Sequence, residues 1–186
     1  MAKSVSVGAK APEATLCDHE GAGVALASLW QTQPVLLVFL RHFGCPHCRS
    51  HAIQLRRDEA KYRAAGAQIV LVGLGEPDKA AAFRRELDLP FTVICDPDKA
   101  VYRAYGLTRR MNLLREATPS NVARYASDAA RYGMALTEQD MFQLGGVFVI
   151  DRAGIVRFAF TAMRAADFPP TLTLLAAIQD ANKVAV

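Results

Sequence analysis

Two cysteines three residues apart, Cys45 and Cys48, carry the most distinctive chemistry in this 186-residue chain. They follow an apolar run, residues 35–40, and a short turn, and a polar, helix-competent stretch follows them. Pro46 suits the first turn of a helix, so the pattern predicts a strand, a turn and a helix with Cys45 at its N-terminus. Helix N-terminal N–H groups stabilise a thiolate, the reactive form of cysteine. We therefore expect Cys45 to be the more acidic and more exposed thiol, and Cys48, about one turn deeper, to close a disulfide with it.

Three basic side chains flank these cysteines in the sequence. His47 lies between them, and Arg41 and His42 come just before them. A cation near a thiolate lowers the pKa of the thiol. His47 also predicts a relatively oxidising pair, because a group that stabilises the thiolate stabilises the reduced form.

A metal site is one alternative for the same residues. His51, three positions after Cys48, would complete a set with Cys45, His47 and Cys48. All four would come from less than two turns of one helix, which cannot surround a tetrahedral ion, so we expect no metal. The other alternative is a pair of ordinary buried thiols.

The amino-acid composition limits the kinds of protein that this chain can be. The chain is 52% hydrophobic and 22% charged with a net charge of +4, which fits a single domain over residues 1–186. Its basic pairs are scattered, so we expect no nucleic-acid partner. Neither a signal peptide nor a membrane-spanning run is evident, which favours a cytoplasmic protein. Cys17 and Cys95 are expected to be isolated, with Cys95 in the core.

Alternating segments predict an α/β fold, a central mixed β-sheet with helices on both faces. Further strands are expected at 67–75, 91–95, 146–151 and 155–161, helices at 46–65, 77–87 and 99–105, and paired extended segments before residue 30. The last two strands form a hairpin around Gly154. A last helix begins near Asp167, with Leu172, Leu175 and Ile178 on one face.

Residues 108–142 differ from the rest, because they contain helix-forming stretches and no strand pattern. We interpret them as a helical insertion. Its arginines and tyrosines are candidates for a substrate mouth or an oligomer contact, although a solvated helix pair is the simpler interpretation; they are Arg109, Arg110, Arg115, Arg124, Arg131, Tyr125 and Tyr132.

Four segments resemble the peroxiredoxin-like (AhpC/TSA-type) branch of the thioredoxin superfamily. They are Ala11-Pro12 with Leu16, residues 41–49, Asp96-Pro97-Asp98-Lys99 with Tyr105-Gly106, and residues 143–151 (QLGGVFVID). The resemblance implies a thioredoxin-like fold, a reactive Cys45, and antioxidant chemistry in which peroxides or disulfides are reduced. It also implies a thiol reductant, such as a thioredoxin or glutathione system, and no cofactor; a homodimer is one possible assembly.

Two departures from that family pattern concern the site. Val38 and His42 stand where peroxiredoxins have the Pro and Thr of Pro-x-x-x-Thr-x-x-Cys. Gly145 and Gly146 stand where peroxiredoxins have an arginine and where thioredoxins have a cis-proline. Arg41 is our candidate for the missing cation, and the Gly145-Gly146 backbone is a candidate surface for a disulfide-linked partner.

Two functions therefore remain open from the sequence. The first is a thiol-dependent oxidoreductase in which Cys45 attacks and Cys48 resolves. The second is a non-catalytic binding or redox-sensor module of the same fold, with or without a metal at the Cys-x-x-Cys region.

Overall fold

A computed structural model describes residues 5–108 and 110–183. Within these ranges the centre is a seven-stranded sheet in the order β2-β1-β5-β4-β3-β6-β7. The strands are β1 (Thr15–Asp18), β2 (Gly23–Ala25), β3 (Val35–Phe39), β4 (Gln68–Gly73), β5 (Thr92–Cys95), β6 (Gly146–Ile150) and β7 (Val156–Thr161). Strands β3, β4 and β5 are parallel, and the other neighbours are antiparallel. The predicted mixed sheet and its closing hairpin are confirmed.

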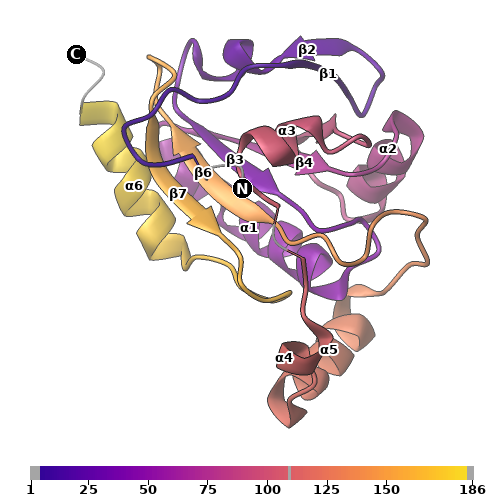
Figure 1. Cartoon of the computed structure of the whole chain (residues 1–186). Helices are drawn as coiled ribbons and strands as arrows, with labels where there is room; N and C mark the ends of the chain where they lie inside the picture. The colour runs from indigo at the N-terminus through magenta and orange to yellow at the C-terminus, as the bar shows by residue number, and fades with distance from the viewer. Residues whose placement is uncertain (1–4, 109, 184–186) are drawn as a thin grey trace.

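Helices cover both faces of this sheet (Figure 1). They are η1 (Leu26–Trp30, a 3-10 helix), α1 (Pro46–Ala64), α2 (Pro77–Glu86), α3 (Ala100–Ala104), α4 (Leu113–Glu116), α5 (Pro119–Tyr132) and α6 (Thr171–Lys183). Side chains of α1, α2 and α6 pack on one face, and those of η1 and α3 on the other. None of the described helices has the length and apolar character needed to span a bilayer.

Strand β3 is the central element that leads to the cysteines. All five of its side chains are fully buried: Leu36 and Val38 face α1, α2 and α6, while Val35, Leu37 and Phe39 face the other layer. Burial on both faces explains why the run is apolar without alternation. Packing on both faces therefore fixes the position of the strand, and the chain turns from its end into α1.

Helix α1 begins and ends where the sequence predicts. Pro46 occupies its first turn, and Gly66, just beyond its end, has the left-handed φ of 82° that favours glycine. Cys48, Ala52 and Leu55 are buried on one face against the sheet, as expected from their spacing. Cys48 is thereby fixed in the core.

The chain between α3 and β6 carries α4 and α5, and we call residues 110–142 the α4–α5 segment. In Figure 1 these two helices extend beyond the sheet, below α1. Neither helix contributes a buried side chain, and large apolar residues remain exposed, including Leu113, Leu114 and Val122. Helices packed this sparsely can open at low cost in free energy.

Two packing expectations were wrong. Helix α6 begins at Thr171, which leaves Leu172 80% exposed and buries Leu174 instead, with Ile178 buried as expected. Cys17 and Cys95 are not isolated from each other, because β1 pairs with β5 and brings them into register. This contact joins segments that are far apart in the sequence, which local pattern cannot reveal.

Gly145 has no room for a side chain. A Cβ there would lie 2.2 Å from the Phe39 carbonyl oxygen, a backbone atom that cannot rotate away. We expect Gly145→Ala to lower the free energy of unfolding by about 3 kcal/mol, the upper part of the range for overpacking. Urea denaturation measures this change.

Gly23→Ala is the matched control, because a Cβ on that strand residue would meet nothing within 4 Å. It should change stability by less than about 0.5 kcal/mol. Equal effects at the two positions would contradict the packing assigned to Gly145.

Candidate active site

Cys45 and Cys48 lie at the N-terminal end of α1, beside the end of β3. Cys45 is the N-cap residue, with an extended backbone (φ −74°, ψ 120°), and its N–H donates to the His42 carbonyl at 3.2 Å. Neither cysteine is in a disulfide, and both are 0% exposed. The prediction that Cys45 is the more exposed thiol is therefore wrong. The α4–α5 segment closes over this turn, where the backbone at Ala135 leaves no space for a Cβ on Gly44.

Arg41 contacts both sulfur atoms. Its Nη1 donates to Cys45 Sγ at 3.1 Å, and its backbone N–H donates to Cys48 Sγ at 3.2 Å. The guanidinium is itself held by the carbonyls of Gln143 (from Nε, 3.2 Å) and Met141 (from Nη2, 2.6 Å). A buried cation with fixed acceptors is therefore aimed at Cys45, as expected for the candidate that replaces the missing family arginine.

The two thiols differ in acidity in the predicted direction. The hydrogen bond with Cys48 lowers the pKa of Cys45 to about 6, assisted by the charge of Arg41 and opposed by burial. Burial, together with the charge and hydrogen bond of Cys45, raises the pKa of Cys48 above its usual value. Cys45 is thus the more acidic thiol and the candidate nucleophile at neutral pH, and Cys48 is the less acidic thiol beside it.

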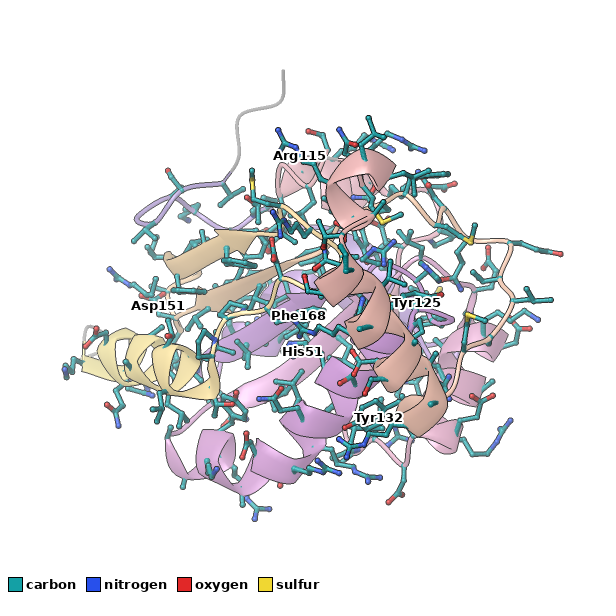
Figure 2. All side chains as sticks on the ribbon, turned by 90° about the horizontal axis from the view of Figure 1, so that it is seen from below. His51, Arg115, Tyr125, Tyr132, Asp151 and Phe168 are labelled. Atoms are coloured by element: carbon teal, nitrogen blue, oxygen red, sulfur yellow. The ribbon has the colours of Figure 1, made fainter. Side chains whose placement is uncertain are left out.

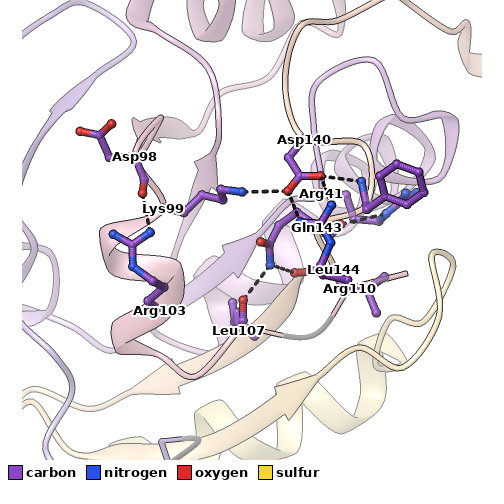
Figure 3. A network of polar contacts seen from close by, with 10 residues as sticks. Arg41, Asp98, Lys99, Arg103, Leu107, Arg110, Asp140, Gln143 and Leu144 are labelled. Atoms are coloured by element: carbon purple, nitrogen blue, oxygen red, sulfur yellow. Dashed lines mark hydrogen bonds and ion pairs between the residues drawn. The ribbon is translucent and has the colours of Figure 1, made fainter. Parts of the chain in front are cut away.

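A polar network holds the carbonyls that bind Arg41 (Figure 3). The Gln143 side chain donates to the carbonyls of Leu107 (2.7 Å) and Leu144 (2.8 Å). Asp140 accepts from Lys99 at 2.8 Å and from Arg110 at 2.7 Å. Burial alone would raise the pKa of Asp140, but these hydrogen bonds lower it to about 2, so the carboxylate stays charged. Residues 140–143 are therefore fixed against the body of the domain.

His42 lies beside Arg41 and is 7% exposed. Burial and the neighbouring charge of Arg41 lower its pKa to about 4, so the imidazole is neutral at physiological pH. Its Nδ1 is buried and has no hydrogen-bond partner among the described residues. The imidazole is therefore neutral, its Nδ1 is buried and unpaired within the described part of the chain, and the residue lines a cavity beside Arg41.

His47 connects the cysteine turn to α5. Its Nδ1 lies 2.7 Å from Asp128 Oδ2, and because a carboxylate only accepts, that nitrogen carries the proton. The ring also packs edge-on against Tyr125. Nearby, Arg49 Nε donates to the Tyr132 carbonyl at 2.7 Å. These contacts hold α5 against the start of α1.

His51 is not part of this group. Its ring stacks on Phe168, with the ring centroids 4.0 Å apart. The two residues are labelled next to each other in Figure 2, which views the molecule from below. Burial lowers its pKa to about 3. In the described part of the chain, no three His, Cys, Asp or Glu side chains form a group suited to a metal ion.

Gly145 and Gly146 do not present a free backbone to a partner. Gly146 pairs with Phe39 and Thr161 across the sheet, and the Gly145 carbonyl accepts from Ala162 N–H. A Cβ at either glycine would collide with neighbouring atoms. Their role is close packing of β6, and the proposed docking surface at these residues is wrong.

The arginines of the α4–α5 segment do not gather at the site. Arg110 pairs with Asp140. The cavity lies between Arg41 and the α4–α5 segment, and its lining does not include Arg115, Arg124 or Arg131. Arg109 lies outside the described residues. Tyr125 does line that cavity. Sequence reasoning missed Asp128 and Gln143. Gln143 lies in the segment that resembled the family, whereas Asp128 gave no signal.

A mixed sheet with this helix arrangement and a Cys-x-x-Cys at a helix start defines a thioredoxin-fold thiol oxidoreductase. The AhpC/TSA family model matches residues 7–159. The chain is 32% identical over 155 residues to a prostamide/prostaglandin F synthase of Danio rerio, covering 81% of this chain and 76% of that one. The match to some other curated relatives is shorter. The chain is 29% identical to peroxiredoxin Q of Gentiana triflora over 103 residues, which cover 55% of this chain and 47% of that one.

Solved structures agree on the fold. Peroxidoxin BcpB of Mycobacterium tuberculosis superposes with a TM-score of 0.69 at 18% identity, covering 95% of this chain and 97% of that one. A candidate thiol:disulfide interchange protein DsbE from Chlorobium tepidum gives 0.65 at 26% identity, covering 96% and 99%. The chain therefore belongs to the AhpC/TSA family and is a thiol-dependent oxidoreductase of peroxides or disulfides.

The His47–Asp128 contact should control the opening of α5. Asp128→Asn removes the charge from a partly buried hydrogen bond that contributes about 1.5 kcal/mol. We expect amide hydrogen exchange within α5 to accelerate about tenfold, with the urea midpoint unchanged. Exchange read by mass spectrometry checks this.

Asp180→Asn, which breaks an exposed ion pair with Lys183 on α6, is the control and should leave exchange in α5 unchanged. Unaltered α5 exchange in Asp128→Asn would show that the contact does not hold the helix.

Proposed function

We propose that this protein is a peroxidase in which Cys45 reacts with peroxide and Cys48 resolves the product. The observation that carries the proposal is the Arg41 guanidinium, 3.1 Å from Cys45 Sγ, with Cys48 held beside the same residue. A fixed cation can stabilise the thiolate and then the negative charge that develops on the departing oxygen.

The two oxidation steps need only these two cysteines and a peroxide, and the return to the reduced protein needs an external thiol. The Cys45 thiolate attacks one peroxide oxygen, an S–O bond forms, the O–O bond breaks, and the departing oxygen takes up a proton. Cys45 is then a sulfenic acid. The Cys48 thiol condenses with it, so that an S–S bond forms and water leaves. Two equivalents of an external thiol, or one dithiol, then reduce this disulfide to the two cysteine thiols and are themselves oxidised to a disulfide.

Direct disulfide reduction is the second candidate, and the Cys-x-x-Cys motif favours it. A disulfide substrate must bring its own sulfur into line with Cys45 Sγ. Both sulfurs are fully buried, which suits a small peroxide better than a protein disulfide. We therefore propose a peroxide, rather than a protein disulfide, as the substrate.

The reductant, the location and the assembly belong to the same proposal. We propose a thioredoxin or glutathione system as reductant, an antioxidant role in the cytoplasm, and a homodimer as the assembly to test by light scattering. The family supports the reductant class, and a rate comparison of the two systems would identify it.

Thiol counting after peroxide addition tests the proposed function. The reduced protein should lose two thiols within seconds of adding one equivalent of hydrogen peroxide, and Cys45→Ser should lose none on that timescale. Survival of both thiols for many minutes, with rapid loss on adding a small disulfide, would instead identify a thiol–disulfide oxidoreductase.

A further inference from the structure

A buried tyrosine hydroxyl lies where β3 ends and the cysteine turn begins. Tyr102 is 0% exposed, and its hydroxyl donates to the Leu40 carbonyl oxygen at 2.5 Å and to the Val72 carbonyl oxygen at 3.0 Å. Leu40 is the residue that follows β3, and its own N–H donates to the same Val72 carbonyl at 2.9 Å. Since the hydroxyl has one hydrogen for two acceptors, it holds both chain segments at a single point.

The position of Tyr102 is itself fixed by its surroundings. Asp96 is 0% exposed, and its carboxylate accepts hydrogen bonds from the N–H groups of Ala100, Val101 and Tyr102 at 2.9 to 3.0 Å. The Tyr102 ring packs edge-on against Phe39, with the ring centroids 5.0 Å apart. Helix α3 therefore places the hydroxyl at the end of β3 with little freedom to move.

The carbonyl that Tyr102 binds belongs to the peptide unit whose N–H faces Cys48. The Leu40 C=O and the Arg41 N–H are parts of one planar peptide and point in opposite directions. The Arg41 N–H donates to Cys48 Sγ at 3.2 Å. A hydroxyl that fixes the oxygen end of this plane therefore also fixes the direction of its N–H, and hydrogen bonds at the two ends of one peptide strengthen each other.

Electrostatic effects connect the same groups. Burial is the largest influence raising the pKa of Tyr102, and the charge of Cys48 raises it further, so the hydroxyl keeps its proton and can donate. Burial and Cys45 raise the pKa of Cys48, whereas the charge and the N–H of Arg41 lower it. The tyrosine hydroxyl, the peptide and the Cys48 sulfur thus form one chain of hydrogen bonds.

We infer that Tyr102 is a positioning residue for the resolving step: through the Leu40–Arg41 peptide, it holds an N–H on the sulfur of Cys48. The inference rests on the proposed function, in which Cys48 attacks the Cys45 sulfenic acid. In that step the Cys48 thiol loses its proton, its sulfur bonds to Cys45 Sγ, the S–O bond breaks, and the departing hydroxide takes up the proton and leaves as water. The Arg41 N–H stabilises the negative charge that Cys48 carries before it attacks.

Two buried tyrosines provide a matched test. Tyr102→Phe removes the hydroxyl and keeps the ring that packs on Phe39. Tyr105→Phe is the control, because Tyr105 is also buried against Phe39, but its hydroxyl donates to the Pro12 carbonyl at 3.2 Å, in the N-terminal segment. Each variant loses one buried hydroxyl, so both should unfold at a lower urea concentration than the wild type.

Competition with dimedone at pH 8 measures the resolving step. One equivalent of hydrogen peroxide is added to the reduced protein with dimedone present, and mass spectrometry gives the ratio of dimedone adduct to disulfide. A weaker hydrogen bond lowers the thiolate fraction of Cys48 but makes the remaining thiolate more nucleophilic, so a loss of thiolate of about tenfold slows resolution about threefold. We expect Tyr102→Phe to raise the ratio about threefold and Tyr105→Phe to leave it unchanged, with Cys45 oxidised at the wild-type rate in both.

The amide proton of Arg41 gives a second readout, which a general loss of stability does not move. In a Cys45→Ser background, the chemical shift of this proton should follow the ionisation of Cys48, the sulfur to which it is hydrogen-bonded. Tyr102→Phe should move the midpoint of this titration to higher pH, and Tyr105→Phe should not. The measurement uses no peroxide.

The outcomes separate this inference from the proposed function. The role of Tyr102 would be overturned by an unchanged adduct ratio in Tyr102→Phe, by an equal rise in Tyr105→Phe, or by an Arg41 titration that neither substitution moves. A wild-type protein that forms no disulfide with peroxide would instead refute the proposed function, and the Arg41 titration would still decide whether Tyr102 holds the N–H on Cys48.

Discussion

Replacing Cys45 by serine is expected to lower peroxide turnover at least about a thousandfold. An alcohol at this position is not ionised at neutral pH and is a weak nucleophile, so the chemical step loses its reacting atom. The substitution is nearly isosteric and buried, and it should preserve the fold. Peroxide consumption in the presence of a thiol reductant measures the loss.

Cys48→Ser should fail at a different step. Cys45 still reacts once, and the sulfenic acid then persists and can be trapped by dimedone. The first step should keep a rate close to the wild-type rate at neutral pH, because the serine hydroxyl can still donate the hydrogen bond that most lowers the pKa of Cys45. Cys17→Ser, on the exposed strand β1, is the control and should keep full turnover. Turnover by Cys45→Ser at the wild-type rate would refute the assignment.

Arg41→Met should have the second-largest effect. Loss of the guanidinium raises the pKa of Cys45 from about 6 toward that of an ordinary thiol. At pH 7 the thiolate fraction falls, and the charge that develops on the departing oxygen also loses its cation, so we expect a loss of about 30-fold in the rate of the first step. Stopped-flow measurement of thiol oxidation by peroxide follows this step. The variant should also be less stable, because the carbonyls of Gln143 and Met141 lose their donor.

The pH dependence of the oxidation rate tests whether a raised pKa of Cys45 causes the slower reaction of Arg41→Met. Raising the pH restores the thiolate, so the difference between Arg41→Met and wild type should narrow toward pH 9. Arg110→Gln removes an arginine that binds Asp140 but not sulfur and should react like the wild type. An Arg41→Met protein with the wild-type rate at pH 7 would show that the guanidinium does not activate Cys45.

Much of the fold was predictable because its signals are local. The apolar run 35–40, the Cys-x-x-Cys motif and Pro46 specify a buried strand followed by a helix, and the structure has β3 and α1 there. The greater acidity of Cys45 was predicted from its position at the start of the helix. In the structure, the hydrogen bond with Cys48 is the largest influence lowering the pKa of Cys45, and the charge of Arg41 lowers it further.

The rest of the site depends on contacts between distant segments. Cys45 is buried because Arg41 and the α4–α5 segment cover it, and no pattern near Cys45 encodes that cover. Asp128 meets His47 across 81 positions, and the Gln143 carbonyl meets Arg41 across 102. The glycine pair before β6 was misinterpreted for the same reason, since its crowding comes from β3 and β7.

Cys48 and Arg41 should together hold the buried Cys45 as a thiolate at neutral pH. The most direct test is the pH dependence of the second-order rate constant for Cys45 oxidation by hydrogen peroxide in the wild-type protein. We expect a rate constant that rises with pH, reaches half its plateau near pH 6, and is flat above pH 7. A profile that is still rising at pH 8, as for an unperturbed thiol with a pKa of about 8.5, would contradict it.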